Sequence, residues 1–162
     1  MLFGRRKSIV KRILIVEDEP LVAFDNELMV GGSGYTVVAT VDNVEDALAV
    51  LARECAVAEG ESDGEEEAEE RGVDLLLTDI TLTGERTGMD LAREAQAFGV
   101  PVLFATAAPP EGGEELALGV LIKPYTDRQL KAALKAIEQI LSAKPKVKVP
   151  DGVILYPPSI PA

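Results

Sequence analysis

Three consecutive leucines, Leu75 to Leu77, constrain the fold of this chain more than any other feature. Successive side chains of a strand point to opposite faces of the sheet, so an unbroken apolar run is typical of a strand covered on both faces. Such strands belong to parallel sheets with helices on each side. The run ends at Asp79, which is either a turn residue or a reactive carboxylate at the edge of the sheet where ligands bind.

Four other apolar runs alternate with helical patterns along the chain. We expect strands at 12–16, 35–41, 73–78, 101–105 and 119–122. We expect amphipathic helices beginning near Pro20, after an N-cap at Asp42 or Asn43, near Met89 and after Thr126. Residues 107–117 leave room for at most a couple of turns, so the fourth helix is truncated. This alternation predicts an α/β fold with a doubly wound (βα)5 parallel sheet.

The chain of 162 residues is long enough for one domain with appendages. We place that domain at 11–142, after a basic N-terminal extension at 1–10. It contains an acidic insertion at 59–71, interpreted either as a solvated loop or as a docking site for a basic partner. A proline-rich tail at 143–162 is expected to be extended rather than helical.

Composition excludes several classes of function. The chain has no histidine, which removes imidazole catalysis and histidine metal sites. Its single cysteine excludes a disulfide framework and suits a reducing cytoplasm. The formal net charge of -12 argues against a nucleic-acid-binding surface. No apolar run is long enough for a membrane helix, and no signal peptide is evident, so we expect a cytoplasmic protein.

Five polar residues follow the predicted strands at the same edge of the sheet: Glu17, Asp18, Asp79, Thr106 and Lys123. Each has an ordinary explanation, as helix-dipole acids, a turn residue, a helix cap or a solvated lysine. Their coincidence at one edge is harder to explain in this way. Crowded carboxylates without imidazole or thiolate ligands suit Mg²⁺. A carboxylate there can act as a nucleophile toward phosphorus, with Lys123 and Thr106 stabilising the transferred group.

Four segments together resemble the response-regulator receiver domain of two-component signalling: Ile13 to Pro20, Leu75 to Asp79, Phe104 to Ala107, and Lys123-Pro124. The resemblance implies a flavodoxin-like sandwich with a five-stranded parallel sheet in the order 2-1-3-4-5. It also makes Asp79 the phosphoacceptor, with Mg²⁺ held by Glu17, Asp18, Asp79 and the backbone carbonyl of Thr81. Thr106 becomes the switch hydroxyl and Lys123 the ion-pair partner of the phosphoryl group.

Some positions depart from the family pattern. Val120 stands where many receivers have an aromatic switch residue, and Thr83 where the family often has proline. Lys123-Pro124-Tyr125 and the short fourth helix are similar to the single-domain FAT GUY regulators, although Ala107-Ala108 replaces the expected Gly-Tyr.

The predicted function is that of a single-domain response regulator. It accepts a phosphoryl group on Asp79 from a phosphohistidine of a sensor histidine kinase or a histidine phosphotransfer protein, and turns over no separate substrate. Output is expected through protein contact at the face of the fourth helix, fifth strand and fifth helix, or through use as a phosphate sink. The alternatives are a degenerate receiver acting as an unphosphorylated adaptor and a Mg²⁺-dependent aspartyl-phosphate phosphohydrolase. The hydrolase would need a carboxylate two residues after Asp79, where Thr81 stands.

Overall fold

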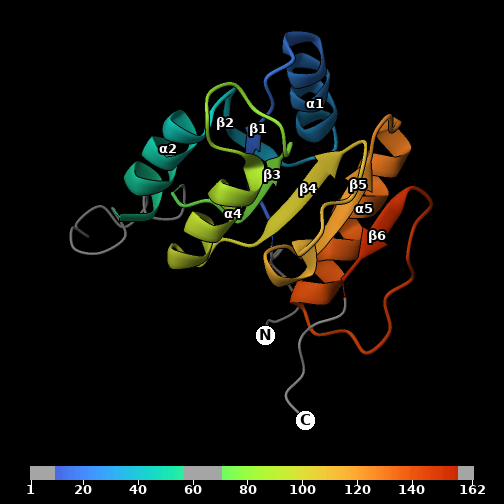
Figure 1. Cartoon of the computed structure of the whole chain (residues 1–162). Helices are drawn as coiled ribbons and strands as arrows, with labels where there is room; N and C mark the ends of the chain where they lie inside the picture. Colours follow the sequence, from blue (N-terminus) through green and yellow to red (C-terminus); the bar gives the residue numbers. More distant parts are fainter. Residues whose placement is uncertain (1–9, 57–70, 157–162) are drawn as a thin grey trace.

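The computed structural model of the chain describes residues 10–56 and 71–156 (Figure 1). Almost all of the predicted basic extension and of the predicted acidic insertion lies outside these residues. In chain order the described elements are β1 (Arg12–Val16), α1 (Pro20–Gly32), β2 (Thr36–Val41), α2 (Val44–Ala56), β3 (Leu75–Thr78), α4 (Gly88–Ala97), β4 (Val102–Thr106), the 3-10 helix η2 (Gly113–Glu115), β5 (Gly119–Ile122), α5 (Asp127–Leu141) and β6 (Val153–Leu155).

The strands form one sheet in the order β2-β1-β3-β4-β5-β6, and the first five are parallel. The predicted α/β class and the predicted order of five strands are therefore confirmed. The predicted truncation of the fourth helix is also confirmed, because only η2 lies between β4 and β5. Within the described residues, no helix combines the length and the apolar character that crossing a membrane requires.

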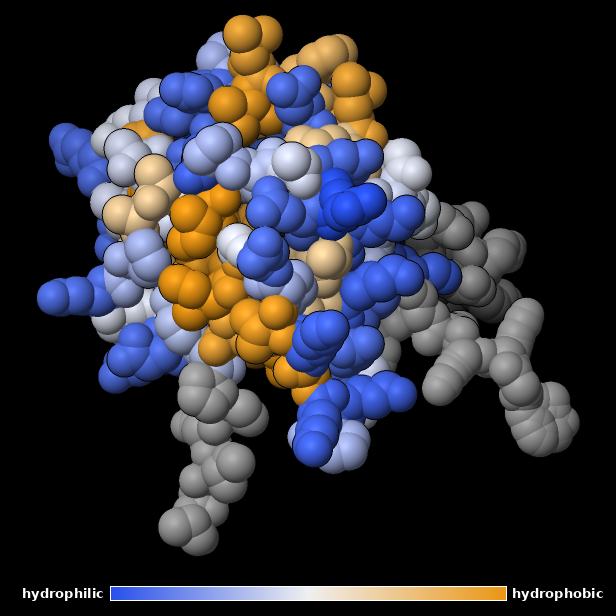
Figure 2. Space-filling view, turned by 90° about the vertical axis from the view of Figure 1, so that its right-hand side faces the viewer, coloured by the Kyte–Doolittle hydropathy of each residue, from blue (hydrophilic) through white to orange (hydrophobic). Residues whose placement is uncertain are grey.

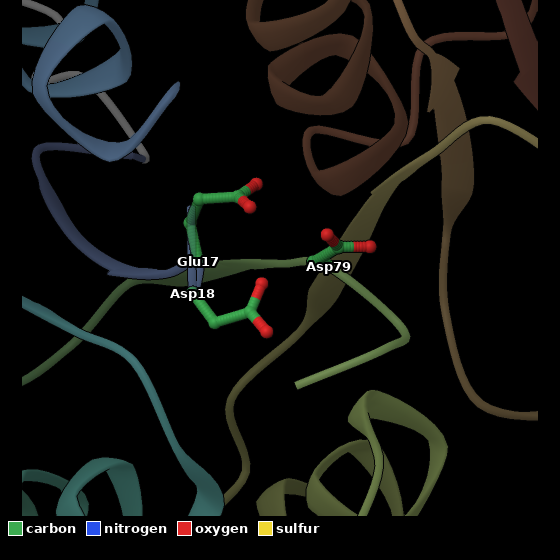
Figure 3. A group of neighbouring side chains, drawn as sticks. All are labelled: Glu17, Asp18 and Asp79. Carbon is green, nitrogen blue, oxygen red and sulfur yellow. The ribbon is translucent and has the colours of Figure 1, made fainter. Parts of the chain in front are cut away.

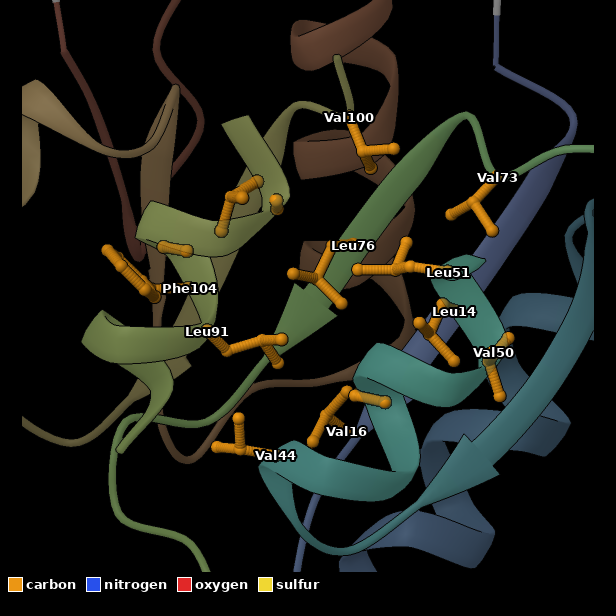
Figure 4. Packing of buried hydrophobic residues seen from close by; sticks show 14 of the residues in the cluster. Leu14, Val16, Val44, Val50, Leu51, Val73, Leu76, Leu91, Val100 and Phe104 are labelled. Carbon is orange, nitrogen blue, oxygen red and sulfur yellow. The ribbon is translucent and has the colours of Figure 1, made fainter. Parts of the chain in front are cut away.

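The sheet separates two apolar clusters, as the strand periodicity requires. On one face, alternate strand residues such as Leu14, Leu76 and Phe104 pack against α2 and α4 (Figure 4). On the other face, residues such as Ile15 and Leu77 pack with the inward residues of α1 and α5. Leu75, Leu76 and Leu77 are all buried, so the leucine run serves both faces of the sheet as predicted.

Helices α2 and α5 begin after capping residues that the sequence predicts. The Asn43 side chain accepts a hydrogen bond from the Asp46 N–H at 2.8 Å, so Asn43 rather than Asp42 precedes α2 as its cap. Thr126 caps α5 in a capping box with Gln129. Thr87 and Asp90 make the same arrangement at the start of α4. These side chains satisfy backbone N–H groups that the first helical turn leaves without partners.

The tail adds a sixth strand to the sheet, which the sequence did not predict. After α5 the chain turns back, and β6 pairs antiparallel with β5. The turn places Gly152 at a φ of 77° and closes with a hydrogen bond from the Val153 N–H to the Pro150 carbonyl at 3.2 Å. The Ile122 N–H donates to the Gly152 carbonyl at 2.9 Å, and the Tyr156 N–H donates to the Leu118 carbonyl at 2.9 Å. The edge of β5 is therefore covered by the chain itself.

Gly119→Ala is expected to release β6 while leaving the rest of the sheet intact. A Cβ at this position would lie 2.5 Å from the Ile154 carbonyl oxygen, and its other near neighbours belong to Leu155 of the same strand. We expect faster amide hydrogen exchange at Ile122 and Tyr156, and a loss of about 1–2 kcal/mol in the free energy of unfolding. Gly31→Ala is the matched control, because a Cβ there meets nothing within 4 Å. Unchanged exchange at both amides in Gly119→Ala would contradict this account of the edge.

Candidate functional site

Three carboxylates meet at the carboxyl end of the sheet (Figure 3). Glu17 and Asp18 follow β1 and Asp79 follows β3, so the pairing of these neighbouring strands brings them together. One oxygen of each residue lies within 4.8 Å of the others. Glu17 is only 2% exposed. The structure thus brings together the three side chains predicted from the sequence as metal ligands.

Backbone hydrogen bonds hold Asp79 at the end of its strand. Its N–H donates to the Val16 carbonyl at 3.0 Å, which continues the pairing of β3 with β1 by one residue. One carboxylate oxygen accepts the N–H of Ile80 at 2.6 Å. The Thr78 hydroxyl donates to the Asp79 carbonyl at 2.8 Å. The carboxylate is therefore fixed on one side, and its second oxygen faces the other charged groups of the site.

Lys123, which follows β5, reaches across the sheet to two of the carboxylates. Its ammonium lies 2.9 Å from a Glu17 oxygen and 2.9 Å from the second Asp79 oxygen. The backbone N–H of Lys123 donates to the Thr106 carbonyl at 2.9 Å, and this bond holds the ends of β4 and β5 together. One cation is thus shared between a buried and a half-buried carboxylate. This arrangement offsets part of the repulsion between them.

The two partners of the Glu17–Lys123 pair show the cost of burying these charges. Burial raises the pKa of Glu17 above its ordinary value, and the hydrogen bonds from Lys123 and from the Glu19 N–H offset this only in part. Burial by itself lowers the pKa of Lys123, but the hydrogen bonds to Asp79 and Glu17 outweigh it, so the net pKa is raised. Lys123 therefore keeps its proton, and every cation near Glu17 stabilises the ionised form of that carboxyl group.

The two predicted threonines lie in different surroundings. Thr106 is 8% exposed at the end of β4, on the strand between β3 and β5. Thr81 is exposed in the loop that follows Asp79. The switch role of the Thr106 hydroxyl and the use of the Thr81 carbonyl as a ligand stay predictions.

Gly88 supports the site and was not singled out from the sequence as a site residue. It is the first residue of α4, and a Cβ there would collide with the backbone carbonyl of Asp79. Its N–H donates to the Ile80 carbonyl at 2.7 Å. The start of α4 thus packs directly on the loop after the phosphoacceptor candidate. A glycine directly after a Thr N-cap was a weak signal for such a close approach.

Among the described residues, a five-stranded parallel core with an acidic triad and a lysine at one edge defines a doubly wound α/β protein. The model of the response regulator receiver domain family matches residues 13–135, and the chain belongs to this family. It is 31% identical over 131 residues to the phyllosphere-induced regulator PhyR of Methylorubrum extorquens. That match covers 78% of this chain and 43% of the relative, so the chain spans less than half the length of the curated relative.

Solved structures agree with this assignment. A receiver domain protein from Clostridium thermocellum matches with a TM-score of 0.63 at 19% identity, covering 83% of this chain and 98% of that one, which supports the fold alone. The response regulator PhyR from Brucella abortus matches with a TM-score of 0.60 at 27% identity, covering 85% of this chain and 51% of that one. Receiver domains generally bind Mg²⁺ through acidic residues, and the triad of Glu17, Asp18 and Asp79 fits such a role.

Lys123→Met is expected to destabilise the metal-free protein in a pH-dependent way. Loss of the ammonium removes interactions that lower the pKa of Glu17, so this pKa rises further above its value in the unfolded chain. A carboxyl whose pKa is raised by folding stabilises the protonated folded state, and that stability is lost as the pH rises through the folded pKa. The deficit against wild type is therefore expected to be about 1–3 kcal/mol at neutral pH and smaller in acid.

Urea unfolding in EDTA across a pH series measures this deficit. The control is Lys131→Met, which removes an exposed lysine of α5 and should change stability by less than about 0.5 kcal/mol. A Lys123→Met deficit that is the same at every pH would show that the Glu17 charge is not its cause.

Proposed function

We propose that Asp79 accepts a phosphoryl group from a phosphohistidine of a sensor histidine kinase or a histidine phosphotransfer protein. The observation that carries this proposal is the meeting of Glu17, Asp18, Asp79 and Lys123 at one strand edge of a receiver fold. An Asp79 carboxylate oxygen attacks phosphorus, and the bond from phosphorus to the imidazole nitrogen breaks. The imidazole leaves with the electron pair of that bond, and the product is an acyl phosphate.

Mg²⁺ is the cofactor that fits this donor set. Glu17, Asp18 and Asp79 offer only carboxylate oxygens, and the carbonyl of Thr81 would add a fourth protein ligand. When bound, the ion would neutralise the crowded carboxylates and the charge that develops on the phosphoryl oxygens. The raised pKa of Glu17 also supports a bound cation, because a second positive charge would stabilise the ionised form of this buried carboxyl group.

The chain's own residues supply the rest of the chemistry. Lys123 carries a fixed positive charge 2.9 Å from the Asp79 oxygen, next to the position where the phosphoryl group would be attached. Thr106, at the end of the neighbouring strand β4, would offer its hydroxyl to a phosphoryl oxygen. The Ile80 N–H holds the other Asp79 oxygen, so the carboxylate is oriented before the reaction. We place this reaction in the cytoplasm.

The output proposed is protein contact or use as a phosphate sink. The predicted output face consists of β5, α5 and the helix that the sequence predicts between β4 and β5, which is not the helix labelled α4. In this chain η2 replaces the fourth helix, and β6 covers the edge of β5, so β6 and α5 form that face. A solved PhyR from Bartonella quintana, 26% identical to this chain, is described as an anti-anti-sigma factor. Output by binding another regulatory protein is consistent with that description.

An acetyl phosphate assay distinguishes the proposed function from its alternatives. With acetyl phosphate and Mg²⁺, the mass of the intact wild-type protein is expected to rise by one phosphoryl group, and chelation of Mg²⁺ should prevent this. Asp79→Asn should gain nothing, because an amide is a poor nucleophile, whereas Asp25→Asn, an exposed change in α1, should behave as wild type.

Three results would count against the proposal. No adduct with any phosphodonor would favour the unphosphorylated adaptor. Adduct formation that persists in Asp79→Asn would assign the acceptor elsewhere. Rapid turnover of a small phosphate monoester would instead favour the phosphohydrolase.

An exposed apolar stripe on α1 lies beside the site. Leu21, Phe24 and Leu28 are 79%, 56% and 59% exposed. Their spacing places them along one side of α1, which begins three residues after Glu17. Figure 2 shows apolar side chains at the top of the molecule, at the height of α1 in Figure 1. A protein that presents a phosphohistidine to Asp79 must cover the rim of the site, and we propose that it packs on this stripe.

Phe24→Ser and Leu28→Ser are expected to slow transfer from a phosphohistidine donor by about tenfold each without changing phosphorylation by acetyl phosphate. Each substitution removes apolar area that the donor protein would bury, whereas the small phosphodonor needs only the carboxylates and Lys123. Val149→Ser, a change at another exposed apolar residue, is the control. The donor is the host sensor kinase that phosphorylates the wild type fastest. Equal loss with both phosphodonors would indicate damage to the site rather than to docking.

A further inference from the structure

One hydrogen bond joins the two chain segments that carry the charged groups of the site. The Tyr125 hydroxyl donates to the Asn26 side-chain carbonyl at 2.7 Å. Asn26 lies on α1 and is only 2% exposed. Tyr125 lies between β5 and α5, two residues after Lys123. The bond therefore connects the segment that follows Glu17 and Asp18 with the segment that follows Lys123.

The bond gives the Lys123 segment a second point of attachment to the β1–α1 segment, beside the ion pair with Glu17. The backbone N–H of Lys123 is bonded to the Thr106 carbonyl. Lys123 contacts Glu17 through a flexible side chain, however, which by itself would let residues 124–126 shift against α1 while the ion pair persists. The phenol ring is rigid and packs in the apolar cluster between the sheet, α1 and α5. With both contacts in place, the backbone of Lys123 has a fixed position relative to the acidic residues after β1.

Burial makes this attachment persistent. The pKa of Tyr125 is raised to about 12, mainly by burial, so the hydroxyl keeps its proton and donates throughout the neutral range. Asn26 is almost fully buried, so its carbonyl would have no solvent to replace the phenol. Leaving a buried polar group without a partner costs more than an average hydrogen bond contributes. The loop therefore has one favoured position against α1.

We propose that Tyr125 and Asn26 are positioning residues that hold Lys123 where it acts on the phosphoryl group transferred to Asp79. This inference rests on the proposed function and goes beyond it, because neither residue touches the reacting atoms. Phosphoryl transfer depends on the placement of fixed charge, and small displacements of such groups reduce rates strongly. Loss of the bond should therefore reduce the rate of phosphorylation more than its effect on folding explains.

Tyr35 provides a matched control for an ordinary structural role. Burial, followed by the charge of Glu138 and a hydrogen bond with its side chain, raises the pKa of Tyr35 to about 12 as well. Tyr35 precedes β2 and so lies at the end of the sheet opposite to Asp79, while packing in the same apolar cluster as Tyr125. Tyr35→Phe and Tyr125→Phe thus each remove one tyrosine hydroxyl, at opposite ends of the same apolar cluster.

The test measures the rate of phosphorylation by acetyl phosphate with saturating Mg²⁺, by intact mass, at a temperature where all variants are folded. Tyr125→Phe is expected to be about three- to tenfold slower than wild type, and Tyr35→Phe to be unchanged, although both unfold at lower urea concentration. Asn26→Leu should match Tyr125→Phe. In a Lys123→Met chain, Tyr125→Phe should cause no further loss of rate, because the residue acts through Lys123.

Each remaining outcome decides the inference. A normal rate in Tyr125→Phe, or an equal loss in Tyr35→Phe, would overturn the positioning role. If Lys123→Met forms no measurable adduct, the Asn26→Leu/Tyr125→Phe double variant decides: a rate no lower than that of either single variant supports the pair, and multiplied losses contradict it. Failure of wild type to form any adduct would refute the proposed function instead, so the two failures are distinguishable.

Discussion

The ammonium of Lys123, shared between Glu17 and Asp79, is the interaction on which the arrangement of the site depends. Carboxylates this close repel each other, and Glu17 is nearly excluded from solvent. Without a cation among them, the strand ends that carry these groups could not pack at this distance with all charges intact. Lys123 supplies this cation at 2.9 Å from each of its two partners. The same positive charge therefore stabilises the folded protein and holds the carboxylates of the site together.

The parallel sheet brings these charged residues together without any special sequence requirement beyond their place at the end of a strand. Residues far apart in sequence meet because all five parallel strands end at one edge, whereas each residue needs only to follow an apolar run. The two apolar clusters fix the strands, and the caps at Asn43, Thr87 and Thr126 start the helices without using site residues. The charged groups of the site are thus carried by loops whose ends are held by buried strands.

Much of the fold and of the site could be predicted because it depends on local patterns. The leucine run, the alternation of strands and helices, and the polar residues after each strand place Glu17, Asp18, Asp79 and Lys123 together. Three features have a weak local signal or none. Val153 to Leu155 is a short run in a proline-rich tail, and its pairing depends on a turn and on Gly119. Gly88 and the Asn26–Tyr125 bond depend on approaches between distant segments, which periodicity does not encode.

The sixth strand changes what a partner can contact. In a sheet that ended at β5, the backbone groups of that strand would be available for pairing with another chain. Here β6 occupies them, and its start is tied both to Ile122, next to Lys123, and to Gln129, whose side chain donates to the Asp151 carbonyl at 3.4 Å. Gln129 also belongs to the capping box of α5. A partner that approaches this side of the molecule therefore meets β6 and α5, two elements anchored within a few residues of Lys123.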